Sequence, residues 1–194
     1  MICFTAGFKN IGSDADVFKM SDIDAVAFDD GSDTLQFLEP TAARTDKTYF
    51  AYDGDWYENV DDWNDANDDQ FDMGTGFLGN FASQATKLTV AGAVLAGPTA
   101  LDYTGKQMVM VGNPLPRTVT FAEIEPVLFD DGSDTLQRLE ATSARTEKTY
   151  FAYAGDWYEN VDDWNDAADD GFAPNEAMLG NFASQTVKLT FPAP

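Results

Sequence analysis

Apolar and polar residues alternate along much of the chain, in short segments that end at turn-forming residues. Residues 47–52 are followed by Asp53 and Gly54 and then by residues 55–57, which is typical of a β-hairpin because glycine adopts the positive φ of a tight turn. Residues 85–95 and 107–111 also have strand character, and 107–111 is apolar on both faces. This spacing predicts an all-β chain of antiparallel strands, with a single helical turn expected only within residues 59–69.

The chain contains an internal repeat. Residues 28–90 align without a gap on residues 129–191 at an offset of 101, and 47 of the 63 aligned pairs are identical. The two stretches differ greatly only at residues 70–77 and their counterparts. We therefore predict two tandem homologous antiparallel β-sandwich modules, copy 1 over residues 1–97 and copy 2 over residues 98–194.

The composition restricts the partners and the chemistry. Against 34 Asp and Glu stand 11 Lys and Arg, and the formal net charge is -23 at pH 7. Such a surface repels phosphate backbones and anionic headgroups, so neither nucleic acid nor membrane insertion is expected. The chain has no His, which removes Ser-His and Cys-His nucleophiles, and its one cysteine, Cys3, has no disulfide partner within the chain. Strong acidity and low thiol content favour an extracellular setting.

Each copy contains an Asp-rich loop whose carboxylates could gather around calcium. The candidate ligands are Asp29, Asp30, Asp33, Asp130, Asp131 and Asp134. The alternative is an Asx turn with solvated charges. Residues 65–69 begin like an EF-hand loop, but the twelfth position is Gly76 and not Glu, so an EF-hand is rejected. No cofactor other than calcium is expected.

Aromatic residues in both copies are candidates for sugar stacking, because exposed rings offer flat apolar platforms. They are Trp56, Tyr57, Trp63, Trp157, Tyr158 and Trp164. In the alternative they are core residues or cross-strand pairs. Carboxylates such as Asp55 and Glu58 could support glycoside hydrolysis, but pairs of this kind arise by chance among 34 acids, so no enzyme is expected.

The two ends of the chain have a pattern that predicts strand exchange. Residues 1–9 alternate so that a terminal strand would have one apolar face. Copy 1 continues past residue 89 through residues 90–95 into copy 2, whereas copy 2 ends with prolines at 192 and 194. The junction between copies then has an unfilled counterpart at each end, and repeating it between chains would build a fibre. The predicted interface residues are Ile2, Cys3, Phe4, Ala6, Phe8, Leu189 and Phe191. In the alternative both ends are solvated.

Copy 2 opens with VGNPLP at 111–116 and continues with DTLQ at 134–137, an aromatic segment at 150–153 and GDWY at 155–158. This pattern resembles a recurrent tandem all-β module, with a G-N-P-x-P opening, of uncharacterised secreted proteins from environmental bacteria. The resemblance implies extracellular or cell-surface placement and no particular activity. Copy 1 departs from the pattern, since its opening is KNIG at 9–12.

Together these features predict a structural subunit of an extracellular filament that assembles head to tail by strand complementation between chains. The expected partner is another copy of the chain, by analogy with strand-donating fimbrial subunits. The alternative is a monomeric cell-surface module that binds polysaccharide through the aromatic residues, with calcium in a supporting role. A hydrolase is the third hypothesis.

Overall fold

The predicted all-β class is confirmed by a computed structural model of the chain. The structure describes residues 8–9, 17–26, 32–39, 44–59, 62–72, 74–82, 87–90, 93–94, 97–103, 108–127, 129, 133–139, 146–160, 163–184 and 187–194. Apart from strands, these ranges contain two 3-10 turns, η1 (Met20–Asp22) and η2 (Phe121–Glu123). In this part of the chain no helix is long and apolar enough to cross a membrane.

Copy 1 forms one large sheet and three shorter strand pairs. The sheet has the order β7-β6-β5-β4-β9, with bounds β4 (Thr34–Glu39), β5 (Arg44–Tyr52), β6 (Asp55–Glu58), β7 (Asn64–Asp65) and β9 (Leu78–Asn80). The antiparallel pairs are β1 (Phe8–Lys9) with β11 (Ala93–Val94), β2 (Val17–Lys19) with β8 (Gln70–Asp72), and β3 (Ile23–Val26) with β10 (Lys87–Val90).

Copy 2 repeats this arrangement with additional strands. Its large sheet has the order β13-β21-β16-β17-β18-β19, with bounds β13 (Met108–Gly112), β16 (Thr135–Leu139), β17 (Thr146–Tyr153), β18 (Asp156–Glu159), β19 (Asn165–Asp166) and β21 (Ala177–Asn181). A second sheet has the order β12-β22-β15, with bounds β12 (Thr99–Asp102), β15 (Glu125–Val127) and β22 (Lys188–Phe191). The remaining pair is β14 (Val119–Thr120) with β20 (Gly171–Phe172). The predicted strand at 107–111 corresponds to β13, whose residues are mostly buried, as its apolar pattern indicates.

A separate hydrophobic core lies in each copy. At the centre of each core one indole N–H donates a buried hydrogen bond across the layers, Trp56 Nε1 to the Ile23 carbonyl at 2.9 Å and Trp157 Nε1 to the Ile124 carbonyl at 3.2 Å. These bonds hold the middle of β6 and of β18 against the opposite layer. The side chains next to each tryptophan in sequence therefore face outward.

The predicted hairpin at residues 53–54 is confirmed. Asp53 and Gly54 have φ values of 52° and 91°, the positive φ pair of a type I′ turn, and they join β5 to β6. In copy 2 the same turn is formed by Ala154 and Gly155, with φ values of 53° and 92°. Ala154 adopts the left-handed region without the polar side chain that favours it in Asp53.

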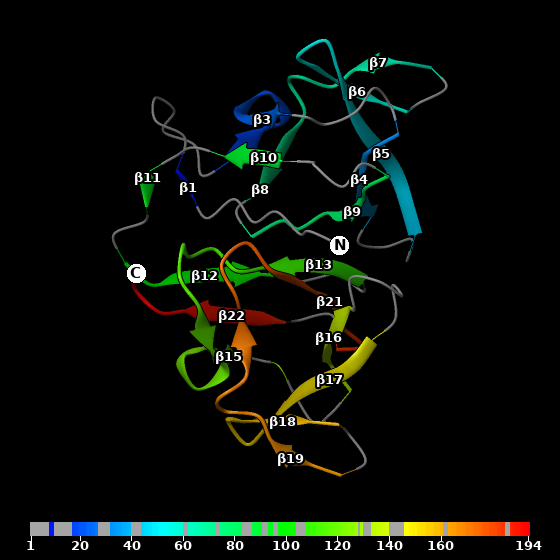
Figure 1. Cartoon of the computed structure of the whole chain (residues 1–194). Helices are drawn as coiled ribbons and strands as arrows, with labels where there is room; N and C mark the ends of the chain where they lie inside the picture. The colour runs from blue at the N-terminus through cyan, green and yellow to red at the C-terminus, as the bar shows by residue number, and fades with distance from the viewer. Residues whose placement is uncertain are drawn as a thin grey trace.

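Among the described residues, the backbone hydrogen bonds between the copies lie at residues 74–76, and Leu38 of copy 1 packs against Met110 and Ala177 of copy 2. Thr75 bridges Val111, the Gly76 N–H donates to the Met110 carbonyl at 3.0 Å, and the Gly112 N–H donates to the Gly74 carbonyl at 3.0 Å. Figure 1 shows β9 of copy 1 and β13 of copy 2 facing each other at this junction. We expected residues 89–95 to form the junction, but their described part, in β10 and β11, pairs inside copy 1. The division into two sandwich domains stays a prediction.

A substitution at Gly76 tests the contact between the copies at residues 74–76. A Cβ at position 76 would lie 2.8 Å from Cβ of Ala177 and 2.9 Å from Cβ of Met110, and neither atom can rotate away. We expect Gly76→Ala to lower the free energy of unfolding by about 1–3 kcal/mol, measured by urea denaturation. Gly97→Ala is the matched control, because a Cβ there meets nothing within 4 Å. Equal unfolding midpoints for the two variants would contradict the described junction.

Candidate functional site

Each copy has a cluster of four aromatic rings on the face of its large sheet opposite the core tryptophan; its phenylalanine is fully buried, and its tryptophan and one tyrosine are exposed. We call these the outer clusters. Outer cluster 1 is Phe50, Tyr52, Tyr57 and Trp63, and outer cluster 2 is Phe151, Tyr153, Tyr158 and Trp164. The hairpin register accounts for them, because Phe50 lies opposite Tyr57 and Phe151 lies opposite Tyr158. Trp63 and Trp164 come from the turn that follows the second strand of each hairpin.

The geometry of the outer clusters is nearly identical in the two copies. The ring of Trp63 lies 4.9 Å from Tyr52, 5.2 Å from Phe50 and 5.5 Å from Tyr57, measured between centroids. The corresponding distances for Trp164 are 5.0, 5.2 and 5.4 Å. Each tryptophan thus packs by its edge or at a tilt on three other rings, which holds it in one orientation.

Four rings of these clusters are the large hydrophobic side chains most exposed in the described part of the chain. Their exposed fractions are 43 % for Tyr52, 45 % for Trp63, 46 % for Tyr153 and 46 % for Trp164. Exposed rings in a group are typical of binding surfaces, so these rings are the candidate site in each copy.

The backbone holds Trp63 and Trp164 in an unusual conformation. Both have φ of 53°, in the left-handed region that bulky residues rarely adopt. The turn is closed by hydrogen bonds from the N–H groups of Asp62 and Trp63 to the Asn59 carbonyl, at 3.1 and 2.9 Å. Copy 2 has the same turn around Asn160. Such a conformation costs about 1–3 kcal/mol and is concentrated at functional sites, so the structure points to a role for these two exposed rings.

Two of the six predicted stacking residues lie elsewhere. Trp56 and Trp157 are 2 % and 3 % exposed and donate their indole N–H groups inside the core, so the prediction that they form exposed platforms is wrong. Sequence reasoning also missed Tyr52 and Tyr153. Period-two alternation from Phe50 and Phe151 places them on the outer face, and this signal could have found them.

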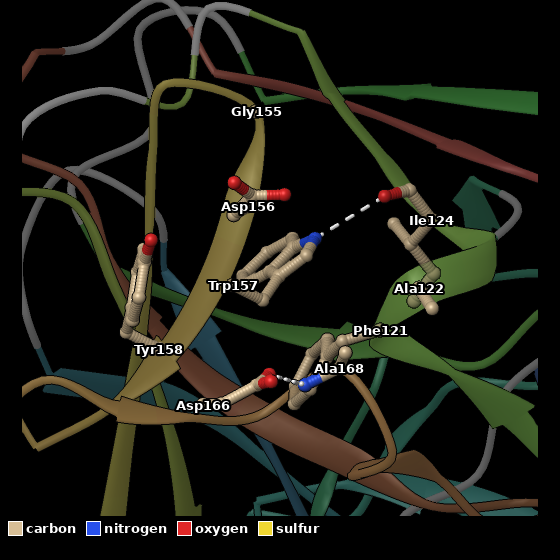
Figure 2. Close-up of a pocket in the computed structure, with 9 residues that line it drawn as sticks. All are labelled: Phe121, Ala122, Ile124, Gly155, Asp156, Trp157, Tyr158, Asp166 and Ala168. Carbon is tan, nitrogen blue, oxygen red and sulfur yellow. Dashed lines mark hydrogen bonds between the residues drawn. The ribbon is translucent and has the colours of Figure 1, made fainter.

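A pocket of about 410 Å³ lies beside outer cluster 2 (Figure 2). Its apolar wall includes Phe121, Ile124 and Trp157, and its polar groups include the carboxylates of Asp156 and Asp166. Figure 2 shows the Trp157 indole extending from β18 toward Ile124, with Asp156 and Asp166 on either side of it in this view. Tyr158 lines the pocket and also contacts Trp164 at 5.4 Å between ring centroids, so the pocket and outer cluster 2 share one residue.

An ion-pair network supports the turn beside this pocket. Lys148 Nζ lies 2.9 Å from both Glu159 and Asp170, and the Tyr150 hydroxyl donates to Asp170 at 3.1 Å. Copy 1 repeats the network, with Lys47 Nζ 3.0 Å from Glu58 and 2.8 Å from Asp69. It joins β17 and β18 to the turn that begins at residue 167.

The pKa values of three groups in this network are shifted by their neighbours. Hydrogen bonds to Asp170 and Glu159 raise the pKa of Lys148, and burial raises the pKa of Tyr150 to about 12. Burial opposes ionisation of Asp170, but the hydrogen bonds from Lys148 and Tyr150 outweigh it and lower the pKa of that carboxyl. These shifts favour charged Lys148 and Asp170 and a neutral Tyr150 at pH 7, so the ion pair that holds the turn is present at that pH.

The predicted calcium ligands are only partly within the described residues. Asp29, Asp30, Asp130 and Asp131 lie outside them. Asp33 and Asp134 are fully buried, and Asp134 accepts hydrogen bonds from both the backbone N–H and the hydroxyl of Ser184. Among the described residues no group of three or more acidic or cysteine side chains could hold a metal ion. Calcium binding stays a prediction.

The predicted polymer interface is also only partly described. Ile2, Cys3, Phe4 and Ala6 lie outside the described residues. Phe8 is in β1, opposite Val94 of β11 in the same chain. Leu189 and Phe191 are fully buried in the core of copy 2, in a strand that pairs with β12 on one side and β15 on the other. As long as those strands stay paired, these two side chains offer no surface to a second chain.

We predict that the stability of copy 2 depends on pH through Asp170. Because its pKa is lower in the folded state, its ionised form stabilises copy 2 above its ordinary pKa of 3.8, and this contribution is lost as the pH falls through the lower folded value. We expect Asp170→Asn to unfold at lower urea concentration than the wild type at pH 7, and the difference to shrink below about pH 4. The exposed neighbour supplies the control variant, Asp169→Asn. A difference that is constant from pH 7 to pH 2.5 would contradict this assignment.

We compared the chain with known proteins. No protein-family model, curated protein or solved structure matched the chain. A function must therefore be inferred from the pair of outer clusters and the adjoining pocket.

Proposed function

We propose that the protein binds extracellular polysaccharide by stacking sugar rings on its two outer clusters. The observation that carries this proposal is the pair of half-exposed tryptophans, Trp63 and Trp164, each held at φ 53° on three other rings. A sugar ring has an apolar face of C–H groups, and a fixed indole buries that face without the entropy loss of ordering a mobile side chain.

The negative charge around the outer clusters restricts the class of polysaccharide that can bind. Tyr52 lies opposite Asp55 in the hairpin, and Tyr153 lies opposite Asp156. Carboxylates accept hydrogen bonds from sugar hydroxyls, but at a net charge of -23 the chain repels a polyanion. The ligand that fits best is therefore a neutral polysaccharide.

Two equivalent clusters in one chain also favour a polymeric ligand. A polysaccharide that occupies one cluster raises the effective concentration of its sugars at the other, provided that both can be engaged by one strand or by neighbouring strands of the polymer. Binding to a polymer should then be much tighter than binding to a single sugar. Catalysis is not part of this proposal.

Replacement of the tryptophans tests the proposal. We expect Trp63→Ala or Trp164→Ala to weaken binding to a neutral polysaccharide by roughly 100-fold, because avidity is lost, and the double variant to abolish it. The measurement is retardation in native gels that contain soluble β-glucan, xylan or mannan. Trp63→Tyr and Trp164→Tyr keep an aromatic platform and should retain most of the binding. A double alanine variant that folds and is retarded like the wild type would refute the proposal.

Head-to-tail assembly is a second proposal, and one observation favours it. In copy 2 the strand β22 pairs with both β15 and β12. In copy 1 the equivalent strand is β10, and within the described ranges its recorded partner is β3, the equivalent of β15. An edge of β10 that takes a strand similar to β12 from another chain would reproduce the copy 2 sheet.

Negative-stain microscopy of the purified chain tests assembly. Uniform fibres are expected if chains complement one another, and an excess of a synthetic peptide with the sequence of residues 97–103 should suppress them, because it carries β12. A scrambled peptide of the same composition is the control. Monodisperse single particles at high protein concentration would contradict the assembly proposal and leave polysaccharide binding untouched.

A further inference from the structure

The repeat supplies an internal comparison at the pocket. In copy 1 the side chain of Asn67 lies over the hairpin, where its Oδ1 accepts a hydrogen bond from the Trp56 backbone N–H at 3.0 Å. Its Nδ2 donates to Asp55 Oδ1 at 3.3 Å. The donor on one side and the carboxylate on the other fix which end of the amide faces each group. Copy 1 therefore holds a carboxamide between one N–H donor and one carboxylate acceptor, and we call this place the amide position.

Copy 2 has the same backbone around this position but lacks the side chain. The residue equivalent to Asn67 is Ala168, and its N–H donates to Asp166 Oδ1 at 2.9 Å, as the Asn67 N–H does to Asp65 at 3.0 Å. The Ala167 N–H donates to the Trp157 carbonyl at 3.1 Å, which matches the 2.9 Å bond between Ala66 and Trp56. The turn is thus preserved, and the change is confined to the side chain.

The missing side chain leaves space and two polar groups. Gly155, Asp156, Trp157 and Ala168 line the pocket of about 410 Å³, a volume within the range of small-molecule sites. The methyl group of Ala168 has no polar atom, so it cannot accept from the Trp157 N–H or donate to Asp156 (Figure 2). The amide position of copy 2 is open to a ligand.

We propose that the pocket of copy 2 binds the acetamido group of an N-acetylated sugar at the amide position. The acetamido carbonyl accepts from the Trp157 backbone N–H, and the acetamido N–H donates to the Asp156 carboxylate, as the two ends of the Asn67 carboxamide do in copy 1. This inference deepens the proposed polysaccharide binding and rests on it for the choice of a sugar as the ligand.

The rest of the pocket fits this group. The side chains of Ala122, which is exposed, and Ala168, which is partly exposed, line the pocket and provide apolar contacts for the acetyl methyl. A carboxylate ligand would be repelled by Asp156 and Asp166, whereas an acetamido group is neutral. Tyr158 belongs to both the pocket and outer cluster 2, so the proposed acetamido site and the stacking surface share one residue.

The chain itself provides the two variants that test the pocket. Ala168→Asn places the copy 1 side chain in copy 2 and should fill the amide position, while Asn67→Ala should open an equivalent position in copy 1. The probe is N-acetylglucosamine, with glucose as the control that lacks the acetamido group. Binding is followed by NMR shifts of the Trp157 and Trp56 backbone amides in the full chain.

We expect N-acetylglucosamine to shift the Trp157 amide and glucose to leave it nearly unchanged. Ala168→Asn should weaken binding of N-acetylglucosamine by at least about tenfold, because two hydrogen bonds are lost. Asn67→Ala should add a second site, seen as a new shift at Trp56. Equal shifts with both sugars, or an Ala168→Asn variant that binds like the wild type, would overturn the proposal. Tighter binding of glucosamine than of N-acetylglucosamine would also overturn it, because the attraction would then be one of charge.

The outer clusters and the pocket can fail separately. If Trp63→Ala with Trp164→Ala abolishes binding to neutral polysaccharide while Ala168→Asn does not affect N-acetylglucosamine, stacking on the clusters stands and the acetamido pocket is refuted. If N-acetylglucosamine still shifts the Trp157 amide in a double tryptophan variant that binds polysaccharide like the wild type, the pocket stands and the stacking proposal is refuted.

Discussion

The buried hydrogen bond from the Trp157 indole to the Ile124 carbonyl, repeated by Trp56 and Ile23, determines where the side chains of the site lie. An indole N–H left unpaired in the core would cost about 1–3 kcal/mol, so the tryptophan stays in one place and one orientation. Because side chains alternate along a strand, fixing Trp157 on the core side of β18 sends Asp156 and Tyr158 to the other side. One anchored residue in each copy thus positions both a carboxylate and a stacking ring.

The two copies differ at Asn67 and its equivalent Ala168, where the backbone of the turn is preserved with either side chain. The turn that contains Asn67 or Ala168 is held by hydrogen bonds of its backbone and by the ion pairs around Lys47 or Lys148. The side chain at that position is therefore not needed to hold the turn. Removing it exposes the N–H of a core residue to a ligand while the core remains packed. The hydrogen bond that Asn67 accepts from the Trp56 N–H in copy 1 would be accepted by the proposed ligand from the Trp157 N–H in copy 2.

The sequence was a better guide to local features than to contacts between distant segments. The hairpin at residues 53–54 could be predicted because its turn chemistry is local, and β13 because it is apolar on both faces. Alternation could not say which face of β6 is buried, since Trp56 and Tyr57 are both aromatic. The contact at residues 74–76 depends on glycines that let two backbones approach, and its signal was the divergence of this loop between copies. The amide position within the pocket differs between the copies by one side chain, and only a comparison of Asn67 with Ala168 shows this difference.

The energetics of the site favour rigid recognition. Each of the two tryptophans at φ 53° costs about 1–3 kcal/mol, a substantial part of the 5–15 kcal/mol that stabilises a typical domain. That free energy is spent during folding, so the rings do not have to be ordered when a ligand arrives. Stacking on a ring distinguishes sugars poorly, because many sugars have an apolar face. The amide position would distinguish them if it binds an acetamido group as proposed, because that group accepts and donates at the two ends that the Asn67 carboxamide uses in copy 1. Under the two proposals, affinity comes from the outer cluster and selectivity from the pocket, and Tyr158 belongs to both.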